Sequence, residues 1–417
     1  MATRFQIYAG ATPSTFVRHR RCLSLEHQRR VPRSLLTAAE RPPAAIVSVY
    51  PRFVPEIRSG FVNACYLFDV AQAIDLGALR RTLGAQATTA RLDDKGPGPP
   101  RLRYIQPPVI VNGDALGCAD LSGFKVRVKF YDYGVVSLML SQAFAGSWSD
   151  LAALGQTLIE SEPLEQLAAD ASRRFVDRTR KAMTTIRPSY LSEDYLVFAV
   201  TGLETPLVAE EVIARHGGDI AQLLRGERQP LSQQERDEVL RHRLSYLADD
   251  LVVPAWNATF VVDTEAAALA TVEILELANS QLLEFRFYDD LLETELTGLY
   301  AELQRSRWAD RMAWRRHSKA TRRVQSLVID VTELTDRMEN AVELVGDVYA
   351  ARLFSLAGAR LGLDHWKRSV EEKLKTLDDI HRFAVDQTGA AQGNIMELAI
   401  LLILVVELWL AFKGILK

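Results

Sequence analysis

The chain has 417 residues, of which 48% are hydrophobic and 25% are charged, and its formal net charge is -3 at pH 7. These values are ordinary for a globular protein with room for two or three domains, and they exclude a global electrostatic pull toward nucleic acid or acidic lipid. The three cysteines, Cys22, Cys65 and Cys118, are far apart and form no CxxC pair, so neither a zinc site nor a disulfide framework is indicated.

The first segment, residues 1–45, carries eight arginines against two glutamates. This composition resembles a mitochondrial transit peptide, and a disordered bacterial extension fits it as well. The segment has no apolar run of the kind found in a secretory signal. We therefore predict an Arg-rich, disordered extension that precedes the folded body.

Residues 46–263 mix strand and helix patterns. Strands are predicted at 46–50, 62–68, 109–113, in two parts of 125–144, at 195–200 and within 251–262, and helices at 75–84, 148–183, 206–216 and 232–248. Because strands and helices alternate unevenly, we predict that this region is an α+β domain.

Residues 264–356 contain no proline, and apolar residues recur there at spacings of three and four in two runs. The first run is Leu275, Ala278, Leu282, Phe285, Asp289, Leu292, Leu296, Leu299 and Leu303, with Asp289 as its one polar member, and the second is Leu327, Val331, Leu334, Met338, Ala341, Val345 and Val348. Such heptad seams need a helical partner, which predicts a coiled-coil stalk over 264–393. The two runs form either a hairpin or one continuous helix, and Gly358 and Gly362 predict a turn before a third helix.

A basic segment, residues 305–323, lies between the two runs and has eight Lys and Arg against one Asp. Its candidate contact residues are Arg305, Arg307, Trp308, Arg311, Trp314, Arg315, Arg316, Arg322 and Arg323. Cations near a membrane surface attract anionic headgroups, so lipid contact is one interpretation and a solvated helix face is another. Nucleic-acid binding by this segment is the least favoured of the three.

Residues 395–412 read IMELAILLILVVELWLAF and contain no Pro, Gly, Lys or Arg. As a helix they would span roughly 27 Å, close to the ~30 Å hydrocarbon core of a bilayer. The apolar residues offset the roughly 2–3 kcal/mol that inserting Glu407 costs, while Glu397 and Trp409 suit the two interfaces. We predict a transmembrane helix at 394–413 that anchors a cytoplasmic body to the bacterial inner membrane. A matrix-facing body at the mitochondrial inner membrane and a buried C-terminal helix are the alternatives.

Motifs for catalysis or cofactor binding are absent: the chain has no GxGxxG, GxxxxGK[ST], GxSxG or HExxH. The acidic residues Asp289, Asp290, Glu293 and Glu295 could bind a cation, but acidic runs on long helices are usually solvated faces. We therefore predict no catalytic residue, no metal and no cofactor. An enzyme whose site has no linear motif, built from Asp289, Asp290 and Glu293, is the rival interpretation.

Four segments carry a family likeness: EKLKTLDDI at 372–380, MELAILLILVVEL at 396–408, ANSQLLEFRFYDDLL at 278–292 and YDYGVV at 131–136. They resemble the "required for meiotic nuclear division" family, a domain family of unknown function, although the chain lacks the Leu-Asp-Thr-Pro element common there. The resemblance implies an α+β body, a helical coiled segment and a terminal membrane span with glutamates at Glu397 and Glu407. It also implies support of translation at the mitochondrial inner membrane, as in eukaryotic members, and no known enzymatic activity.

Together these observations predict a membrane-anchored scaffold or interaction protein that presents an α+β module on a helical stalk. Its expected partners are the lipid bilayer, a second copy of the chain and an unidentified protein. We expect the seams and Glu407 to support self-association, because a carboxyl inside a membrane is protonated or paired. A membrane factor that tethers RNA or the translation machinery through 305–323 is an alternative function.

Overall fold

The computed structural model divides the chain into two units, residues 1–52 and 53–417, and every described residue belongs to the second. The described residues are 56–89, 103–104, 106–113, 120–121, 123–159, 161–187, 191–306, 326–329, 331–333, 335, 342–343, 348–380, 382, 401–405, 407 and 409. The predicted extension 1–45 and the predicted strand 46–50 lie outside them.

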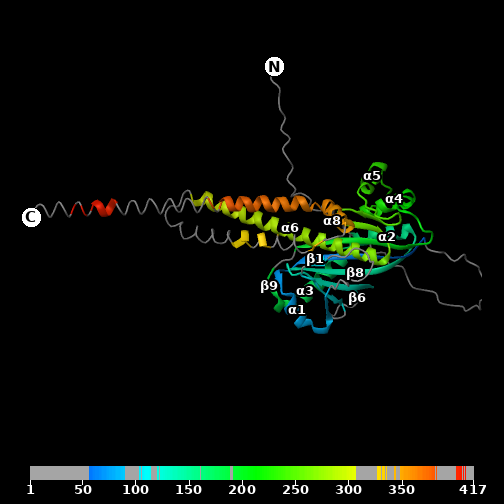
Figure 1. Cartoon of the computed structure of the whole chain (residues 1–417), viewed down its shortest axis with the longest axis horizontal. Helices are drawn as coiled ribbons and strands as arrows, with labels where there is room; N and C mark the ends of the chain where they lie inside the picture. The colour runs from blue at the N-terminus through cyan, green and yellow to red at the C-terminus, as the bar shows by residue number, and fades with distance from the viewer. Residues whose placement is uncertain are drawn as a thin grey trace, which may run out of the picture. The chain divides into compact units, whose positions relative to one another are not determined.

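Nine strands of the described chain form a central sheet (Figure 1). They are β1 Ile57–Asp69, β3 Ala87–Thr89, β5 Val109–Asn112, β6 Asp120–Leu121, β7 Phe124–Phe130, β8 Val135–Gly146, β10 Ser192–Leu203, β11 Leu251–Pro254 and β12 Ala258–Val262. The order is β11-β12-β10-β1-β8-β7-β5-β3, with β6 paired to β7. The sheet is mixed, because β10 and β12 run parallel whereas the other neighbours are antiparallel.

Two smaller sheets accompany the central one. β2 Ala71–Ile74 pairs with β9 Met183–Ile186, and β4 Arg103–Tyr104 pairs with β13 Val342–Glu343. Only Val70 separates β2 from the end of β1, and the pairing of β2 with β9 matters for the site described below.

The central strand β1 is buried on both faces of the sheet. Tyr66 and Phe68 point into one apolar cluster, while Cys65 and Leu67 point into the other. Successive side chains of a strand alternate between the two faces, so a strand without a solvated face is apolar almost throughout. The sheet therefore needs a helical layer on each side.

One face of the sheet is covered by α1 Leu76–Leu83, α2 Trp148–Ile159, α3 Glu162–Thr179 and α4 Ala209–Arg225, and α5 Gln233–Arg241 packs on α4. The first helix begins where the sequence predicts, because the Asp75 carboxylate accepts a hydrogen bond from the Ala78 amide at 2.9 Å. The predicted helix at 148–183 divides into α2 and α3, and β9 follows from Met183. The α+β character of this region is thus observed.

The opposite face is covered by α6 Glu265–Ser306 and α8 Val348–Leu361, which lie side by side in Figure 1. Val272, Leu275 and Leu283 of α6 are buried in the same cluster as the strand residues of that face. Gly362 adopts a φ of 71°, and residues 363–380 continue as a further helix. The first half of α6 is therefore a layer of the folded body.

This arrangement corrects the predicted coiled-coil stalk. The first heptad run does face helices, but its described partners are α8 and residues 363–380, and α6 also packs on the sheet. A helix through the second run is interrupted, because Val342 and Glu343 pair with β4 as a strand. A heptad pattern shows that a helix has an apolar face, but it does not show what covers that face.

The predicted membrane span at 394–413 is wrong, and with it the bacterial or mitochondrial inner-membrane localisation. The lipid bilayer as a partner is not tested by this finding and stays a prediction. Within the described part of the chain, no helix has both the length and the apolar character that a bilayer crossing requires. Of the expected span, residues 401–405, 407 and 409 are described, and they are helical and exposed. A crossing needs about 20 residues in one unbroken helix, and hydropathy along a sequence does not establish such a helix.

Candidate functional site

Four side chains of α6 form a polar stripe that faces the sheet: Glu276, Ser280, Glu284 and Tyr288. All four are buried. They follow one another at intervals of four residues, which places them on one side of the helix. Buried polar groups need partners, so the stripe marks where the sheet must present matching groups.

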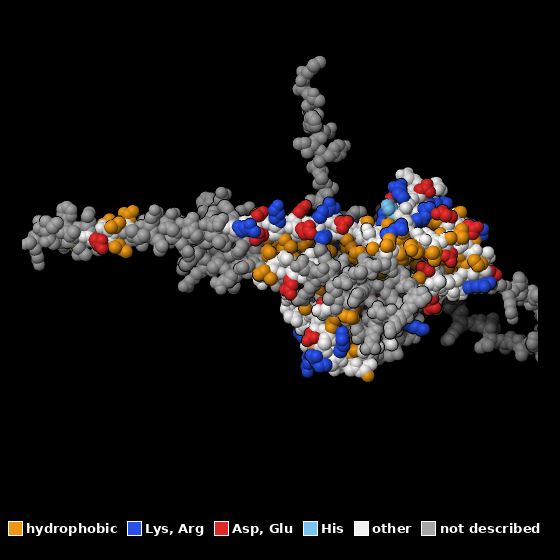
Figure 2. All heavy atoms as spheres, viewed as in Figure 1, with side chains coloured by type: hydrophobic (Ala, Val, Ile, Leu, Met, Phe, Trp, Pro, Cys, Tyr) orange, Lys and Arg blue, Asp and Glu red, His pale blue; other side chains and the backbone are white. Residues whose placement is uncertain are grey.

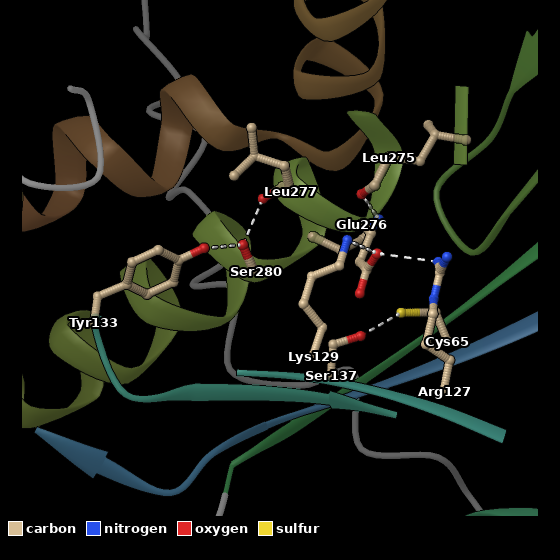
Figure 3. A network of polar contacts seen from close by, with 10 residues as sticks. Cys65, Arg127, Lys129, Tyr133, Ser137, Leu275, Glu276, Leu277 and Ser280 are labelled. Atoms are coloured by element: carbon tan, nitrogen blue, oxygen red, sulfur yellow. Dashed lines mark hydrogen bonds and ion pairs between the residues drawn. The ribbon is translucent and has the colours of Figure 1, made fainter. Parts of the chain in front are cut away.

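The sheet presents cations to the first residue of the stripe. In β7 the basic residues Lys125, Arg127 and Lys129 alternate with apolar residues, so the three share one face of the strand. Lys129 Nζ lies 2.6 Å from Glu276 Oε2, and Arg127 Nη2 lies 3.9 Å from the same oxygen (Figure 3). The Lys129 and Glu276 side chains are each only 1% exposed.

These charges keep the Glu276 carboxylate ionised. Burial by itself would raise the pKa of Glu276, but the nearby Lys129 and Arg127 outweigh it, so the pKa lies below its usual value. Beside this pair, Cys65 Sγ lies 3.4 Å from Ser137 Oγ, and burial raises the pKa of the thiol. Cys65 is therefore a poor nucleophile, because the thiolate is the reactive form.

The middle of the stripe is a neutral contact. The Tyr133 hydroxyl lies 2.6 Å from Ser280 Oγ, and Ser280 also donates to the Leu277 carbonyl at 2.7 Å (Figure 3). Tyr133 belongs to the turn between β7 and β8, where Gly134 has a φ of 99°. A Cβ at Gly134 would lie 1.8 Å from the Ala71 carbonyl oxygen, so only glycine lets this turn approach the chain after β1.

The last two residues of the stripe, Glu284 and Tyr288, belong to an acidic cluster that also contains Asp69, Arg187 and Phe287. Asp69 ends β1, and Arg187 directly follows β9. Arg187 Nε lies 2.6 Å from Asp69 Oδ1, while its Nη2 lies 3.8 Å from Glu284 Oε2 and donates to the Tyr288 hydroxyl at 3.4 Å. The guanidinium also stacks 3.4 Å from the centroid of the Phe287 ring.

The acidic cluster holds two carboxyls for one cation, and both carboxyl side chains are 0% exposed. Burial raises the pKa of Asp69 to about 7, although Arg187 opposes the shift. Burial, and then the negative charge of Asp69, raises the pKa of Glu284 well above its usual value. The pair therefore titrates as a unit and can hold a proton near neutral pH.

The predicted acidic site on α6 is occupied by a lysine. Lys373 Nζ lies 3.0 Å from Asp289 Oδ1 and 2.9 Å from Glu293 Oε2, and Ser369 Oγ donates to Asp289 at 2.5 Å. In the described ranges no group of three or more His, Cys, Asp or Glu could hold a metal ion. Lys373 thus fills the position that a cation would take between Asp289 and Glu293.

The other predicted site residues are not brought to the polar stripe. Glu407 and Trp409 are exposed helical residues. Arg305 is part of α6, but its side chain lies outside the described part of the chain. Glu397, Arg307, Trp308, Arg311, Trp314, Arg315, Arg316, Arg322 and Arg323 also lie outside the described residues.

Sequence reasoning missed the polar stripe, although a signal was present. Glu276 and Glu284 each stand between apolar residues in a helix with several buried apolar positions. The heptad runs do not include either glutamate. Polar residues at four-residue intervals within an otherwise apolar helix indicate a buried polar face.

A second feature is an apolar surface patch formed by Val208, Tyr246, Leu247 and Val348, whose side chains are 44%, 65%, 62% and 69% exposed. Apolar side chains are visible on the surface in the region of α4 and α8 in Figure 2. The Ala209 amide donates to the Ala248 carbonyl at 2.8 Å, which joins the start of α4 to the loop 245–250. Tyr246 makes an edge contact with Tyr349 of α8, with ring centroids 5.7 Å apart.

The loop that contains Tyr246 and Leu247 is stabilised by hydrogen bonds between its own residues. The buried Asp250 carboxylate accepts hydrogen bonds from the Tyr246 amide at 2.7 Å and from the Leu247 amide at 2.6 Å. Ser245 Oγ lies 2.7 Å from the carbonyl oxygens of both Leu247 and Asp250. The backbone is therefore satisfied internally, and the two apolar side chains point outward.

Comparisons with known proteins match about half of the chain. A family model described as "Uncharacterized protein MJ0711, N-terminal domain" matches residues 59–268. Uncharacterized protein MJ0711 of Methanocaldococcus jannaschii is 23% identical over 223 residues, which are 54% of this chain and 67% of the archaeal protein. No solved structure matches.

These matches correct the resemblance to the "required for meiotic nuclear division" family, because they indicate a different family and nothing points to that one. Of the segments that suggested it, 278–292 and 372–380 are helical, and 131–136 is the turn that leads into β8. The matched range 59–268 includes Asp69, Lys129 and Arg187 but ends before Glu276 and Glu284 of α6. The sheet side of the polar stripe thus belongs to the matched region.

Proposed function

The chain belongs to the family of the uncharacterized protein MJ0711 N-terminal domain, and from its structure we infer that it is an interaction protein that self-associates through the apolar patch. One observation supports this proposal most strongly. Tyr246 and Leu247 are exposed on a loop whose backbone is fixed by hydrogen bonds to Asp250. Contiguous exposed apolar side chains mark interaction surfaces more often than isolated ones do.

The patch has the properties of a binding surface that would lose little conformational entropy on association. Tyrosine is enriched among the residues that dominate binding energies, because its ring is large and has few rotatable bonds. The two amide bonds to Asp250 restrain the loop before any partner arrives. Association then loses less conformational entropy than it would with a flexible loop.

A second copy of the chain suits this surface because its rim carries both signs of charge. Arg243 Nη2 lies 3.5 Å from Glu210 Oε1, and both side chains are more than a third exposed. In a two-fold dimer the same patch meets itself, so a rim with both signs can pair with its own copy. An apolar centre with a mixed-charge rim is therefore self-complementary.

The test is the oligomeric state of the full chain by sedimentation velocity over a range of concentrations. We expect the wild type to form dimers and Tyr246→Glu with Leu247→Glu to raise the dimer dissociation constant at least tenfold, since buried charges oppose association. Trp256→Glu is the matched control, because Trp256 is 60% exposed in the turn between β11 and β12.

The proposal is wrong if the wild type is a monomer throughout, or if the double variant dimerises as well as the wild type. Equal unfolding midpoints of the wild type and the two variants would show that the fold is intact. A dimer that Trp256→Glu disrupts and the double variant does not would place the interface at the β11–β12 turn.

A further inference from the structure

Asp69 and Glu284 reach the same buried position from two different layers of the protein. Asp69 is the last residue of β1 in the sheet, and Glu284 lies in the middle of α6. Arg187 contacts both carboxyls, at 2.6 Å and 3.8 Å. At this position Arg187 therefore connects a carboxyl of the sheet, Asp69, to a carboxyl of the helix, Glu284.

The charges at this position do not balance when both acids are ionised. The sheet contributes Asp69, the segment after β9 contributes Arg187, and α6 contributes Glu284 and the Tyr288 hydroxyl. Burial raises the pKa of Tyr288, so its hydroxyl is neutral at physiological pH. Two carboxylates and one guanidinium would leave one uncompensated negative charge in a site where both carboxyl side chains are 0% exposed.

We propose that Asp69 and Glu284 hold a single proton between them in the folded protein at neutral pH, and that this proton-binding site links the seating of α6 on the sheet to pH. With the proton bound, one carboxylate pairs with Arg187 and the other carboxyl is neutral. When the proton leaves, like charges on β1 and α6 face each other across the interface.

Glu276 provides an internal comparison. It lies on the same side of α6, about two turns before Glu284, and it is just as deeply buried. Two cations, Lys129 and Arg127, face it, and its pKa lies below the usual value. Burial alone therefore does not make a carboxyl hold a proton here. Glu284 differs from Glu276 because it shares a single cation, Arg187, with a second carboxyl.

The sign of the pH effect follows from proton counting. In the unfolded chain both carboxyls have pKa values near 4. Between about pH 4 and pH 7 the folded chain binds one proton that the unfolded chain lacks, because one carboxylate is paired with Arg187 while burial and that negative charge keep the other carboxyl neutral. The stabilisation is complete below pH 4 and is lost as the pH rises through 7, and the unfolding constant rises up to tenfold per pH unit.

Infrared spectroscopy of the full chain tests the proton directly, because a protonated carboxyl has its own C=O stretch. We expect a buried carboxylic-acid band at pH 6 that disappears by pH 9. Asp69→Asn and Glu284→Gln should each remove the band, since one remaining carboxyl then faces Arg187 alone and ionises. Glu276→Gln is the matched control and should leave the band in place.

Denaturant unfolding between pH 5 and pH 8 tests the link to α6. In the wild type the unfolding constant should rise by up to tenfold per pH unit, because folding binds about one proton. In Glu284→Gln this rise should be absent, because the proton-binding site is lost. After correction for the base-catalysed rise of the intrinsic exchange rate, the protection of the α6 amides near residue 284 should decrease above pH 7 in the wild type but not in this variant. A wild type without the band at pH 6, or a band that persists in both single variants, would overturn the proposal. The wild-type measurement decides even if a variant does not fold.

Discussion

Glu276 and Glu284 stand on one side of a single helix with the same burial, yet their surroundings drive their pKa values in opposite directions. Lys129 and Arg127 face Glu276, whereas Glu284 shares Arg187 with Asp69. The ratio of cations to carboxyls, and not the depth of burial, therefore determines which glutamate is ionised. One helix–sheet interface thus contains a permanent ion pair and a site that responds to pH.

The ion pair should be the more sensitive of the two regions to loss of its cation. Lys129→Met leaves the buried Glu276 carboxylate with only the more distant Arg127, and we expect a loss of about 3–5 kcal/mol in the free energy of unfolding. Denaturant unfolding at pH 7 measures this loss. The double variant Lys129→Met with Glu276→Leu is the control, and it should recover most of the stability because no buried charge is left unpaired. A loss below about 1 kcal/mol in the single variant would contradict the comparison.

The acidic cluster should respond differently to the same kind of change. Arg187→Leu leaves Asp69 and Glu284 without their cation, but both can bind protons, so the expected loss is about 2–3 kcal/mol at pH 7 and smaller at pH 5. Both carboxyls then have raised pKa values, so the stability of this variant should fall more steeply with pH than that of the wild type. Unfolding curves at both pH values test this, and a loss that does not change with pH would remove the distinction between the regions.

The neutral contact between the two charged regions should have the smallest effect. Tyr133→Phe removes the 2.6 Å hydrogen bond to Ser280 and should lower stability by about 1 kcal/mol, equally at pH 5 and pH 8. Thermal and denaturant unfolding of this variant provide the measurement. Ser280→Ala is the variant of the other partner. The loss of unfolding free energy in the double variant should not exceed the sum of the losses in the two single variants. A clear pH dependence would show that Tyr133 belongs to one of the charged regions.

Most of the sheet could be predicted from local alternation. The segments 62–68, 125–144 and 195–200 lie in β1, β7 with β8, and β10, because apolar side chains repeat along each strand. Helix ends were less predictable: α5 ends at Arg241 and not at 248, because the chain turns back so that Leu244 pairs with Val252. A pairing between two extended segments leaves no signal in the helix pattern that precedes it.

The acidic cluster could not be predicted from the sequence either, because its residues meet only in the folded structure. Asp69, Arg187 and Glu284 come from three distant parts of the chain, and none belongs to a motif. Asp69 ends an apolar strand, and a charged residue at a strand end is usually solvated. Only the packing of α6 over that strand end makes it a buried acid.

The amino-acid sequence by itself determined which residues share a face, in β7 through alternation and in α6 through intervals of four. The tertiary structure alone decided that these two faces meet, because Lys129 and Glu276 are 147 positions apart, as are Tyr133 and Ser280. The ionisation of a carboxyl depends on the charges and solvent around it in space, and neither is local along the chain. The proton between Asp69 and Glu284 is therefore a property of the fold.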